Sequence, residues 1–213
     1  MTAYDEELLE RNEREARSSA EIIVPFLLSR YHPRDLLDIG CARGLWASIA
    51  HAAGVFVFGI DDAEIPPDKL LIPEERYIRL DFESEIRSVR ADYDMALCLE
   101  VAEHLTPGSG DRLVEWLCRS AKTIVWSAAV PFQGGSGHIN EQWPSYWHER
   151  FRKFGFEPDG MPRLALWHNK AIQPYYRQNL MVYQRDGGPS VFTQDLVHPD
   201  LWTYKFSHPT ART

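Results

Sequence analysis

A polar loop with three glycines carries side chains that can move a proton. The stretch FQGGSGHINEQWPSYW, residues 132–147, follows the apolar run TIVWSAAVP and places Glu141 three residues after His138. Imidazole titrates near neutral pH and is the commonest general base, and a nearby carboxylate can orient it or act as a base itself. We therefore predict catalytic roles for His138 and Glu141. The open alternative is that His138 only pins the loop through a hydrogen bond to the backbone.

Other side chains of this loop are candidates for substrate contact. Asn140 offers both a donor and an acceptor, and Trp143 and Tyr146 can wall a pocket. Trp147 follows Trp143 by four residues, so both fall on one face of a helix that begins near Pro144. Burial in the core is the favoured role of these aromatic residues. Asn140 also has an alternative role as a cap of that helix.

His104 is a second candidate base. Together with His138 and Glu141 it makes a set of two imidazoles and a carboxylate, which suits a transition metal. These residues lie on separate segments without a metal-binding spacing, and we expect no metal.

The segment LWHNKAIQPYYRQN offers a third wall for a substrate pocket. It contains His168, Tyr175, Tyr176 and Arg177. We predict substrate contacts for Tyr176 and Arg177, since a guanidinium suits a carboxylate or phosphate group. A surface ion pair would explain Arg177 equally well.

These residues need a scaffold, and short strand-like and helical segments alternate along the chain. Strands are predicted at 35–40, 55–62, 76–82, 93–101, 123–130, directly after Gly155, and at 178–185. Helices are predicted at 5–29 with a break or kink near Pro25, at 45–54, at 109–121 and from 145 to about 154. This alternation predicts an α/β fold with a Rossmann-like, doubly wound, mainly parallel sheet and helices on both faces. Ligands bind at the carboxyl ends of the strands in such sheets.

The first predicted strand ends in a glycine turn, LLDIGCARGLW. Its spacing is Asp38-x-Gly40-x-x-x-Gly44, and glycines there let the backbone approach a ligand closely. A dinucleotide fingerprint would require G-x-G-x-x-G, but residue 42 is Ala and the two glycines stand four apart. A nicotinamide-dependent dehydrogenase is therefore disfavoured.

Acidic residues end the next two strands. Asp61 is placed to accept hydrogen bonds from both hydroxyls of a ribose, and Asp81 with Phe82 suits the edge and face of an adenine. Taken singly, each acid is better explained as part of a solvated turn or as a cap.

In this order the motifs resemble a class I S-adenosylmethionine-dependent methyltransferase of the small-molecule type. The fourth strand supports the resemblance, because YDMALCLEVAEHL resembles the E-x-x-EH segment that these enzymes carry there. The resemblance covers roughly residues 34–185 and implies a seven-stranded sheet with an antiparallel last strand. It implies S-adenosylmethionine as cofactor, with these cofactor-binding residues: Asp38, Gly40, Cys41, Ala42, Gly44, Trp46, Asp61, Asp81, Phe82 and Glu100.

One residue departs from the family pattern. Ala42 stands where the family usually has its middle glycine, and its methyl group is tolerated there only if φ is negative. We expect a slightly different turn and the same cofactor.

Length and charge limit the remaining possibilities. With 213 residues, a net charge of −8 and no run of basic residues, the chain suits one domain that acts on a small molecule and binds neither nucleic acid nor membrane. The three cysteines Cys41, Cys98 and Cys118 are scattered, which indicates reduced thiols in a cytoplasmic protein. We expect a monomer or homodimer. We predict a domain over 1–188, with a helical lid at 1–30 that includes Tyr4 and a core at 34–185. Residues 189–213 are predicted to form an extension laid on the surface.

The function that follows is methylation of a small polar metabolite or natural-product intermediate. O-methylation is favoured because a hydroxyl acceptor gains most from a base, here His138. The alternatives are a small-molecule N-methyltransferase and a non-catalytic cofactor-binding partner subunit.

Overall fold

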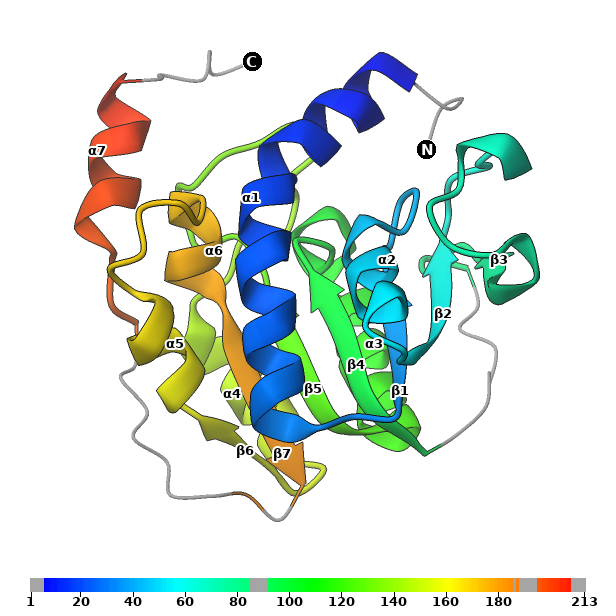
Figure 1. The fold of residues 1–213 in the computed structure, drawn as a ribbon. Coiled ribbons are helices and arrows are strands. Elements are labelled where there is room, and N and C mark those ends of the chain that lie inside the picture. Colours follow the sequence, from blue (N-terminus) through cyan, green and yellow to red (C-terminus); the bar gives the residue numbers. More distant parts are fainter. Residues whose placement is uncertain (1–5, 85–91, 186, 188–194, 208–213) are drawn as a thin grey trace.

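The central sheet has the predicted architecture. The computed structural model describes residues 6–84, 92–185, 187 and 195–207 of the chain. Among these residues, seven strands pair in the order β3-β2-β1-β4-β5-β7-β6 (Figure 1). Their bounds are β1 Asp35–Ile39, β2 Phe56–Asp61, β3 Tyr77–Arg79, β4 Tyr93–Leu99, β5 Ala121–Ser127, β6 Phe156–Asp159 and β7 Met181–Arg185. β7 runs antiparallel to β5 and β6, whereas the other neighbouring pairs are parallel, so the predicted sheet is confirmed.

Helices cover both faces of this sheet. Their bounds are α1 Glu6–Tyr31, α2 Leu45–Ala52, α3 Pro107–Ser120, α4 Pro144–Arg152, α5 Met161–Leu166, α6 Pro174–Asn179 and α7 Pro199–Ser207, with 3₁₀ turns η1 Pro67–Lys69, η2 Glu74–Arg76 and η3 Ala102–His104. Successive strand residues point to opposite faces. In β5, Ile124 and Trp126 therefore pack with α3 and α4, while Val125 packs with α1, α2 and α6. The two apolar layers fix the strand ends that carry the site.

The N-terminal helix forms where it was predicted, without the break that Pro25 suggested. α1 runs without a break through Pro25, which lies on the exposed side of the helix. Proline removes one backbone hydrogen bond, but buried Val24 and Leu27 beside it hold the helix on the sheet. The predicted lid residue Tyr4 lies outside the described residues.

The last part of the chain contains helices that were not predicted from the sequence. α7 contacts α6, and Leu201 of α7 is buried, so α7 lies against α6. Residues 178–179, predicted to begin the last strand, instead end α6. Neither α5 nor α6 was predicted, since each has only six residues, too few to show a helical period.

A search of the described helices for a membrane-spanning candidate finds none with the necessary length and apolar character.

Candidate active site

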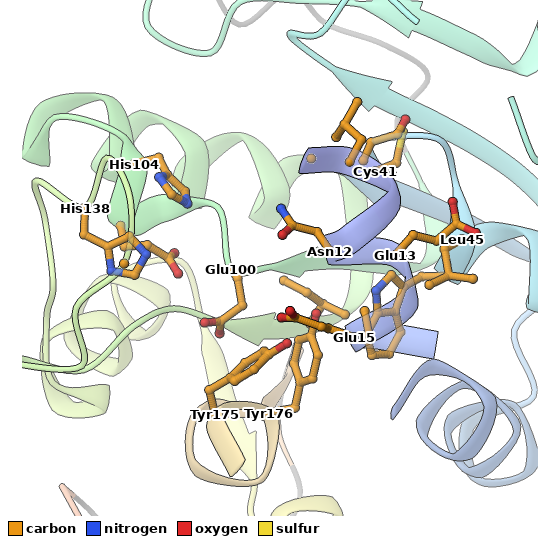
Figure 2. A pocket seen from close by; sticks show the side chains of 18 of the residues that line it. Asn12, Glu13, Glu15, Cys41, Leu45, Glu100, His104, His138, Tyr175 and Tyr176 are labelled. Atoms are coloured by element: carbon orange, nitrogen blue, oxygen red, sulfur yellow. The ribbon is translucent and has the colours of Figure 1, made fainter. Parts of the chain in front are cut away.

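A cavity of about 440 Å³ opens at the carboxyl ends of β1 and β4. Its wall is formed by one face of α1, the glycine turn, the end of β4 with η3, and the loop after β5, with α6 and α7 on one side. Figure 2 shows His104, His138 and Glu100 on one side of the cavity and Cys41, Asn12 and Glu13 on the other. The size lies within the range of about 300–1,000 Å³ that is usual for small-molecule sites.

The glycine turn brings backbone to the cavity wall. The N–H groups of Gly40 and Cys41 both donate to the carbonyl of Ile60, at 2.8 and 3.2 Å. Gly40 has φ +69°, and a Cβ there would collide with a side-chain methyl of Val101. Glycine is therefore required at this position for both conformation and space.

Ala42 adopts a left-handed conformation in this turn. Its φ is +47°, so the expectation of a negative φ is wrong. Its N–H donates to Oδ2 of Asp61 at 2.7 Å, and the neighbouring hydrogen bonds to β2 fix the rest of the turn. The turn thus keeps the shape that a glycine would allow, at a cost of roughly 1–2 kcal/mol for a left-handed alanine.

Two buried carboxylates lie beneath the turn. Oδ2 of Asp38 accepts the N–H of Ala47 at 3.2 Å, and burial raises the pKa of Asp38 to about 7, with a smaller contribution from the charge of Asp61. Asp61 accepts N–H groups on both oxygens, from Ala42 and, at 2.9 Å, from Ala63. Burial also raises the pKa of Asp61 above its ordinary value, against the lowering effect of those bonds. A ligand with positive charge would favour the ionised form of Asp38.

Glu100 stands at the end of β4 in a strained conformation. Its φ is +56°, and its N–H donates to the carbonyl of Ser127 at 2.9 Å. Its carboxylate accepts from Nδ2 of Asn179 at 3.1 Å and from Nε2 of Gln133 at 3.2 Å. Strain of this kind persists where surrounding bonds fix it, and it is common at functional sites. The network ties α6 and the loop after β5 to the cavity.

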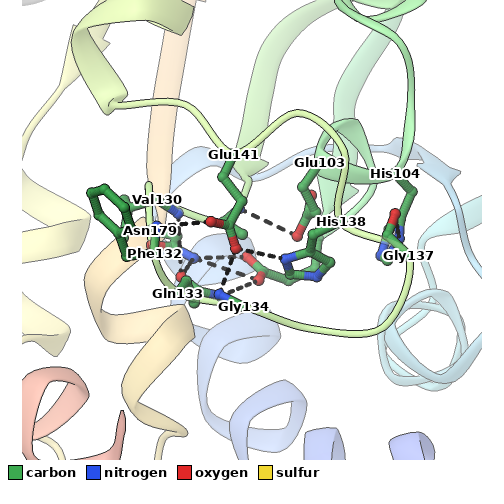
Figure 3. A network of polar contacts seen from close by, with 12 residues as sticks. Glu103, His104, Val130, Phe132, Gln133, Gly134, Gly137, His138, Glu141 and Asn179 are labelled. Carbon is green, nitrogen blue, oxygen red and sulfur yellow. Dashed lines mark hydrogen bonds and ion pairs between the residues drawn. The ribbon is translucent and has the colours of Figure 1, made fainter. Parts of the chain in front are cut away.

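The loop after β5 is closed on itself by Glu141. Oε2 of Glu141 accepts the N–H of Phe132 at 2.8 Å, and Oε1 accepts the N–H of Gly134 at 2.5 Å (Figure 3). Oε1 also lies 3.0 Å from Nδ1 of His138. With the proton on Nδ1, the lone pair of Nε2 is free.

Gly135 makes room for the His138 ring. A Cβ on Gly135 would collide with Nε2 and Cε1 of that ring. His138 and the backbone of Gly134 and Gly135 all line the cavity. The loop therefore presents an oriented imidazole to the same space as the glycine turn.

Glu103 and His104 lie in η3 beside His138. The two imidazole rings meet edge to face with centroids 4.9 Å apart, and Nδ1 of His104 lies 3.3 Å from the carbonyl of Gly137. Packing around the ring and the charge of His138 lower the pKa of His104, although the residue is exposed overall. Glu103 is fully buried, and burial with the nearby charge of Glu100 raises its pKa well above the ordinary value.

No protein-family model matches the sequence, and no curated protein matches it. Solved structures do match. Magnesium protoporphyrin IX methyltransferase from Synechocystis PCC 6803, with bound SAM, has a TM-score of 0.60 at 14% identity and covers 87% of each chain. The 1,6-didemethyltoxoflavin-N1-methyltransferase of Burkholderia thailandensis, with S-adenosylhomocysteine and 1,6-didemethyltoxoflavin bound, has a TM-score of 0.55 at 18% identity and covers 81% of this chain and 80% of that one.

The chain has the fold of class I S-adenosylmethionine-dependent methyltransferases. A further neighbour with this fold is the [4+2]-cyclase SpnF, with a TM-score of 0.52 at 15% identity, covering 79% of this chain and 81% of that one. The likeness therefore establishes the fold, and the reaction has to be argued from the site.

The cavity of this methyltransferase fold contains some of the predicted cofactor residues. Those that line it are Asp38, Gly40, Cys41, Ala42, Trp46 and Glu100. Gly44 is the N-cap residue before α2 and does not line the cavity, and Asp61 is engaged with the turn. Asp81 is exposed and Phe82 is buried in the core, both away from the cavity wall. The predicted ribose and adenine contacts of these residues stay predictions.

Most of the predicted substrate residues lie elsewhere. Tyr176 lines the cavity, and its ring packs edge to face with that of Trp46, with the ring centroids 5.0 Å apart. Arg177 is buried against α7, where it pairs with Asp200 at 2.8 Å, and the exposed His168 does not line the cavity. The predicted third wall therefore consists of Tyr175 and Tyr176 alone.

The loop residues predicted to contact substrate have structural partners. Nδ2 of Asn140 donates to the carbonyl of Ala102 at 3.2 Å, which fastens the loop to η3. Tyr146 packs against the core under the guanidinium of Arg150, and Trp143 precedes the first residue of α4. None of the three is on the cavity wall, and Trp147 is core as favoured.

Several lining residues were not found from the sequence. Asn12, Glu13 and Glu15 come from α1, Gln133 from the loop after β5 and Leu201 from α7. The Glu and Arg residues of α1 gave no sign of which ones face inward. Gln133 could have been found by asking which amide side chain can reach Glu100, the first acid of the E-x-x-EH segment.

Proposed function

We propose that this protein is an S-adenosylmethionine-dependent methyltransferase that acts on a hydroxyl group of a small polar acceptor. One observation carries the proposal: a ligand-type glycine turn and an oriented imidazole, His138, line the same cavity. The methyltransferase fold makes S-adenosylmethionine the natural ligand of the turn.

The methionine part of the cofactor would lie along the glycine turn. The backbone at Gly40 approaches closely there, and the buried carboxylate of Asp38 suits a cationic group. Glu100 lies across the cavity and supplies a second carboxylate near the reacting centre. Asp61, with Asp81 and Phe82, is proposed to hold the ribose and adenine.

Bound cofactor supplies an electrophilic methyl group for in-line transfer. The protein has to hold the acceptor in line and receive its proton. Nε2 of His138 is available for that proton, since Nδ1 is held by Glu141. Proton transfer of this kind contributes about 10²–10⁴-fold in rate. His104 is the neighbouring alternative base.

α1 is proposed to act as the lid. Glu13 pairs with Arg43 of the glycine turn at 3.4 Å, so the helix is tied to the proposed cofactor site. Asn12 and Glu15 of the same helix add polar groups to the cavity wall. This composition suits a polar metabolite or natural-product intermediate.

The proposal extends to partners and location. The net charge of −8 disfavours nucleic acid, and we propose a small molecule as the partner of a monomer or homodimer. Cys41, Cys98 and Cys118 are free and buried, which supports a reducing, cytoplasmic compartment.

The test is transfer of an isotopically labelled methyl group from S-adenosylmethionine into a metabolite extract, followed by mass spectrometry and NMR of the labelled product. The account predicts label on an oxygen and release of S-adenosylhomocysteine. Label on nitrogen would favour the N-methyltransferase alternative. Cofactor binding without any transfer would favour the non-catalytic subunit.

A further inference from the structure

Three side chains at one end of the cavity form a compact set of metal-type donors. Glu103, His104 and His138 each offer one ligand atom, and these three atoms lie within 4.8 Å of one another. Glu103 and His104 come from η3, and His138 comes from the loop after β5 (Figure 3). All three residues line the cavity, so an ion between them would be reached from it.

Each imidazole has one nitrogen engaged and the other free to coordinate. Nδ1 of His138 lies 3.0 Å from Oε1 of Glu141, and Nδ1 of His104 lies 3.3 Å from the carbonyl of Gly137. Metal-binding histidines almost always donate their second ring N–H to a carboxylate or a backbone carbonyl, which fixes the ring and the tautomer. The supporting bonds of a metal site are therefore in place for both rings.

Glu103 gives the independent observation. The residue is fully buried, and its Oε1 accepts the N–H of Ala129 at 3.2 Å. Its Oε2 is buried and finds no hydrogen-bond partner among the residues that the structure describes. A buried carboxylate oxygen without a partner is costly, and a bound cation would satisfy it.

The backbone holds the two segments together. The N–H groups of Ile139 and Asn140 donate to the carbonyl of Glu103 at 2.8 and 3.0 Å, and the Asn140 side chain bonds Ala102. The loop that carries His138 is thus fastened to the turn that carries the other two donors. Such prior ordering lowers the cost of binding an ion.

We propose that Glu103, His104 and His138 bind one divalent first-row transition-metal ion at this end of the cavity. Two imidazole nitrogens and one carboxylate suit Mn²⁺, Fe²⁺, Co²⁺ or Zn²⁺, whereas Mg²⁺ and Ca²⁺ prefer sites made of oxygen. Three protein ligands leave coordination positions open to a substrate.

The metal site suggests a substrate class for the proposed methyltransferase, and this suggestion rests on the proposed function. Open positions favour an acceptor hydroxyl with a second oxygen on the neighbouring carbon, such as a vicinal diol or an α-hydroxy carbonyl. A metal lowers the pKa of a hydroxyl or water bound to it. In the metal-loaded protein His138 would be a ligand, and the ion would lower the pKa of a bound acceptor hydroxyl so that its proton passes to water in the cavity; without metal, Nε2 of His138 would take that proton.

The test is metal binding by chelator-treated protein. Co²⁺ and Zn²⁺ are added separately, with bound metal measured after dialysis and the Co²⁺ absorption spectrum recorded. We expect one ion per chain and a loss of affinity of about tenfold or more in Glu103→Gln, His104→Ala and His138→Ala. His168→Ala is the matched control, an exposed histidine away from the cavity, and should bind as the unmodified protein does. Circular dichroism checks folding, and the exposed position of His104 keeps one variant informative if the buried Glu103 variant fails to fold.

Measurements of metal binding, methyl transfer and cofactor affinity distinguish an error in the metal site from an error in the proposed function. The metal site is overturned if the unmodified chain binds no ion. It is also overturned if His104→Ala and His138→Ala bind the ion as tightly as the unmodified chain does. Full methyl transfer by metal-free protein overturns the role of the ion in proton loss and leaves the proposed function standing. One bound ion with no affinity for S-adenosylmethionine leaves the metal site and removes the proposed function.

Discussion

Nδ1 of His138 lies 3.0 Å from Oε1 of Glu141, and the same carboxylate receives the N–H groups of Phe132 and Gly134. One side chain therefore orients the imidazole and also closes the loop that carries it. The two effects are coupled, because Oε1 accepts the N–H of Gly134 and also holds the ring, while Oε2 accepts the N–H of Phe132.

This pair gives the first prediction. His138→Ala should lower turnover by about 10²-fold or more while cofactor affinity changes little, since the ring lies at the acceptor end of the cavity. Glu141→Gln should lower turnover less, because an amide keeps one acceptor oxygen for the ring, although it loses the charge and replaces the other acceptor with an N–H donor. Turnover and calorimetric affinity are measured side by side, with His168→Ala as control. Equal losses of affinity, stability and turnover in His138→Ala would show that His138 only supports the loop.

Gly135 tests the placement of the ring without changing its chemistry. Gly135→Ala puts a methyl group against Nε2 and Cε1 of His138, so the ring has to move and turnover should fall at least about tenfold. Gly108→Ala in α3 is the matched control, because a Cβ there approaches only the end of Arg112, at 3.9 Å. Thermal unfolding should stay near that of the parent in Gly108→Ala and fall in Gly135→Ala, so turnover is compared at a temperature at which both variants are folded. Unchanged turnover in Gly135→Ala would contradict the assigned position of the ring.

Ala42 predicts a stabilising substitution. Because Ala42 has φ +47°, Ala42→Gly should relieve strain and raise the free energy of unfolding by about 1 kcal/mol, or roughly 2–4 °C in Tm. Ala52→Gly at the exposed end of α2 is the control and should cost up to about 1 kcal/mol. A loss of stability in Ala42→Gly equal to that in the control would refute the strain at this turn.

Asp38 predicts a pH dependence. Burial raises its pKa to about 7, above the ordinary value of 3.8, so the folded state holds this proton more tightly than the unfolded state. Its contribution to stability is present below about pH 4 and is lost as pH rises through about 7. Denaturant titrations across this window should show the loss, and Asp38→Asn should flatten it. The nearby Asp61 contributes in the same direction and remains in that variant.

The same carboxyl group predicts how cofactor affinity changes. A cationic ligand favours ionised Asp38, so the affinity for S-adenosylmethionine should fall as pH drops below about 7, with proton release on binding near that pH. Calorimetry in buffers of different ionisation enthalpy measures the release. A pH-independent affinity with no proton release would contradict a cationic ligand at Asp38.

The sheet and the glycine turn could be predicted because their signals are local. Asp38-x-Gly40-x-x-x-Gly44 and the acid Glu100 follow apolar strands directly, so strand ends alone place them at one edge. His138 was found for the same reason, as a loop residue after β5. The order of strands and helices along the chain assigns these residues to the carboxyl edge of the sheet, and no knowledge of side-chain packing is needed.

Helical register could not be predicted in the same way. Tyr176 and Arg177 are neighbours in α6, but one lines the cavity and the other turns to Asp200 of α7. Adjacent helical residues point in different directions, and only the packing of α6 selects the inward one. The positive φ of Ala42 was missed because it is imposed by bonds to Ile60 and Asp61, which are distant in the sequence.

Calorimetric titration with S-adenosylmethionine, S-adenosylhomocysteine and NAD decides whether the glycine turn binds the proposed cofactor. We predict one-to-one binding of the first two compounds, weakened by Asp38→Asn, and no binding of NAD. Binding of NAD without binding of either S-adenosyl compound would contradict this prediction.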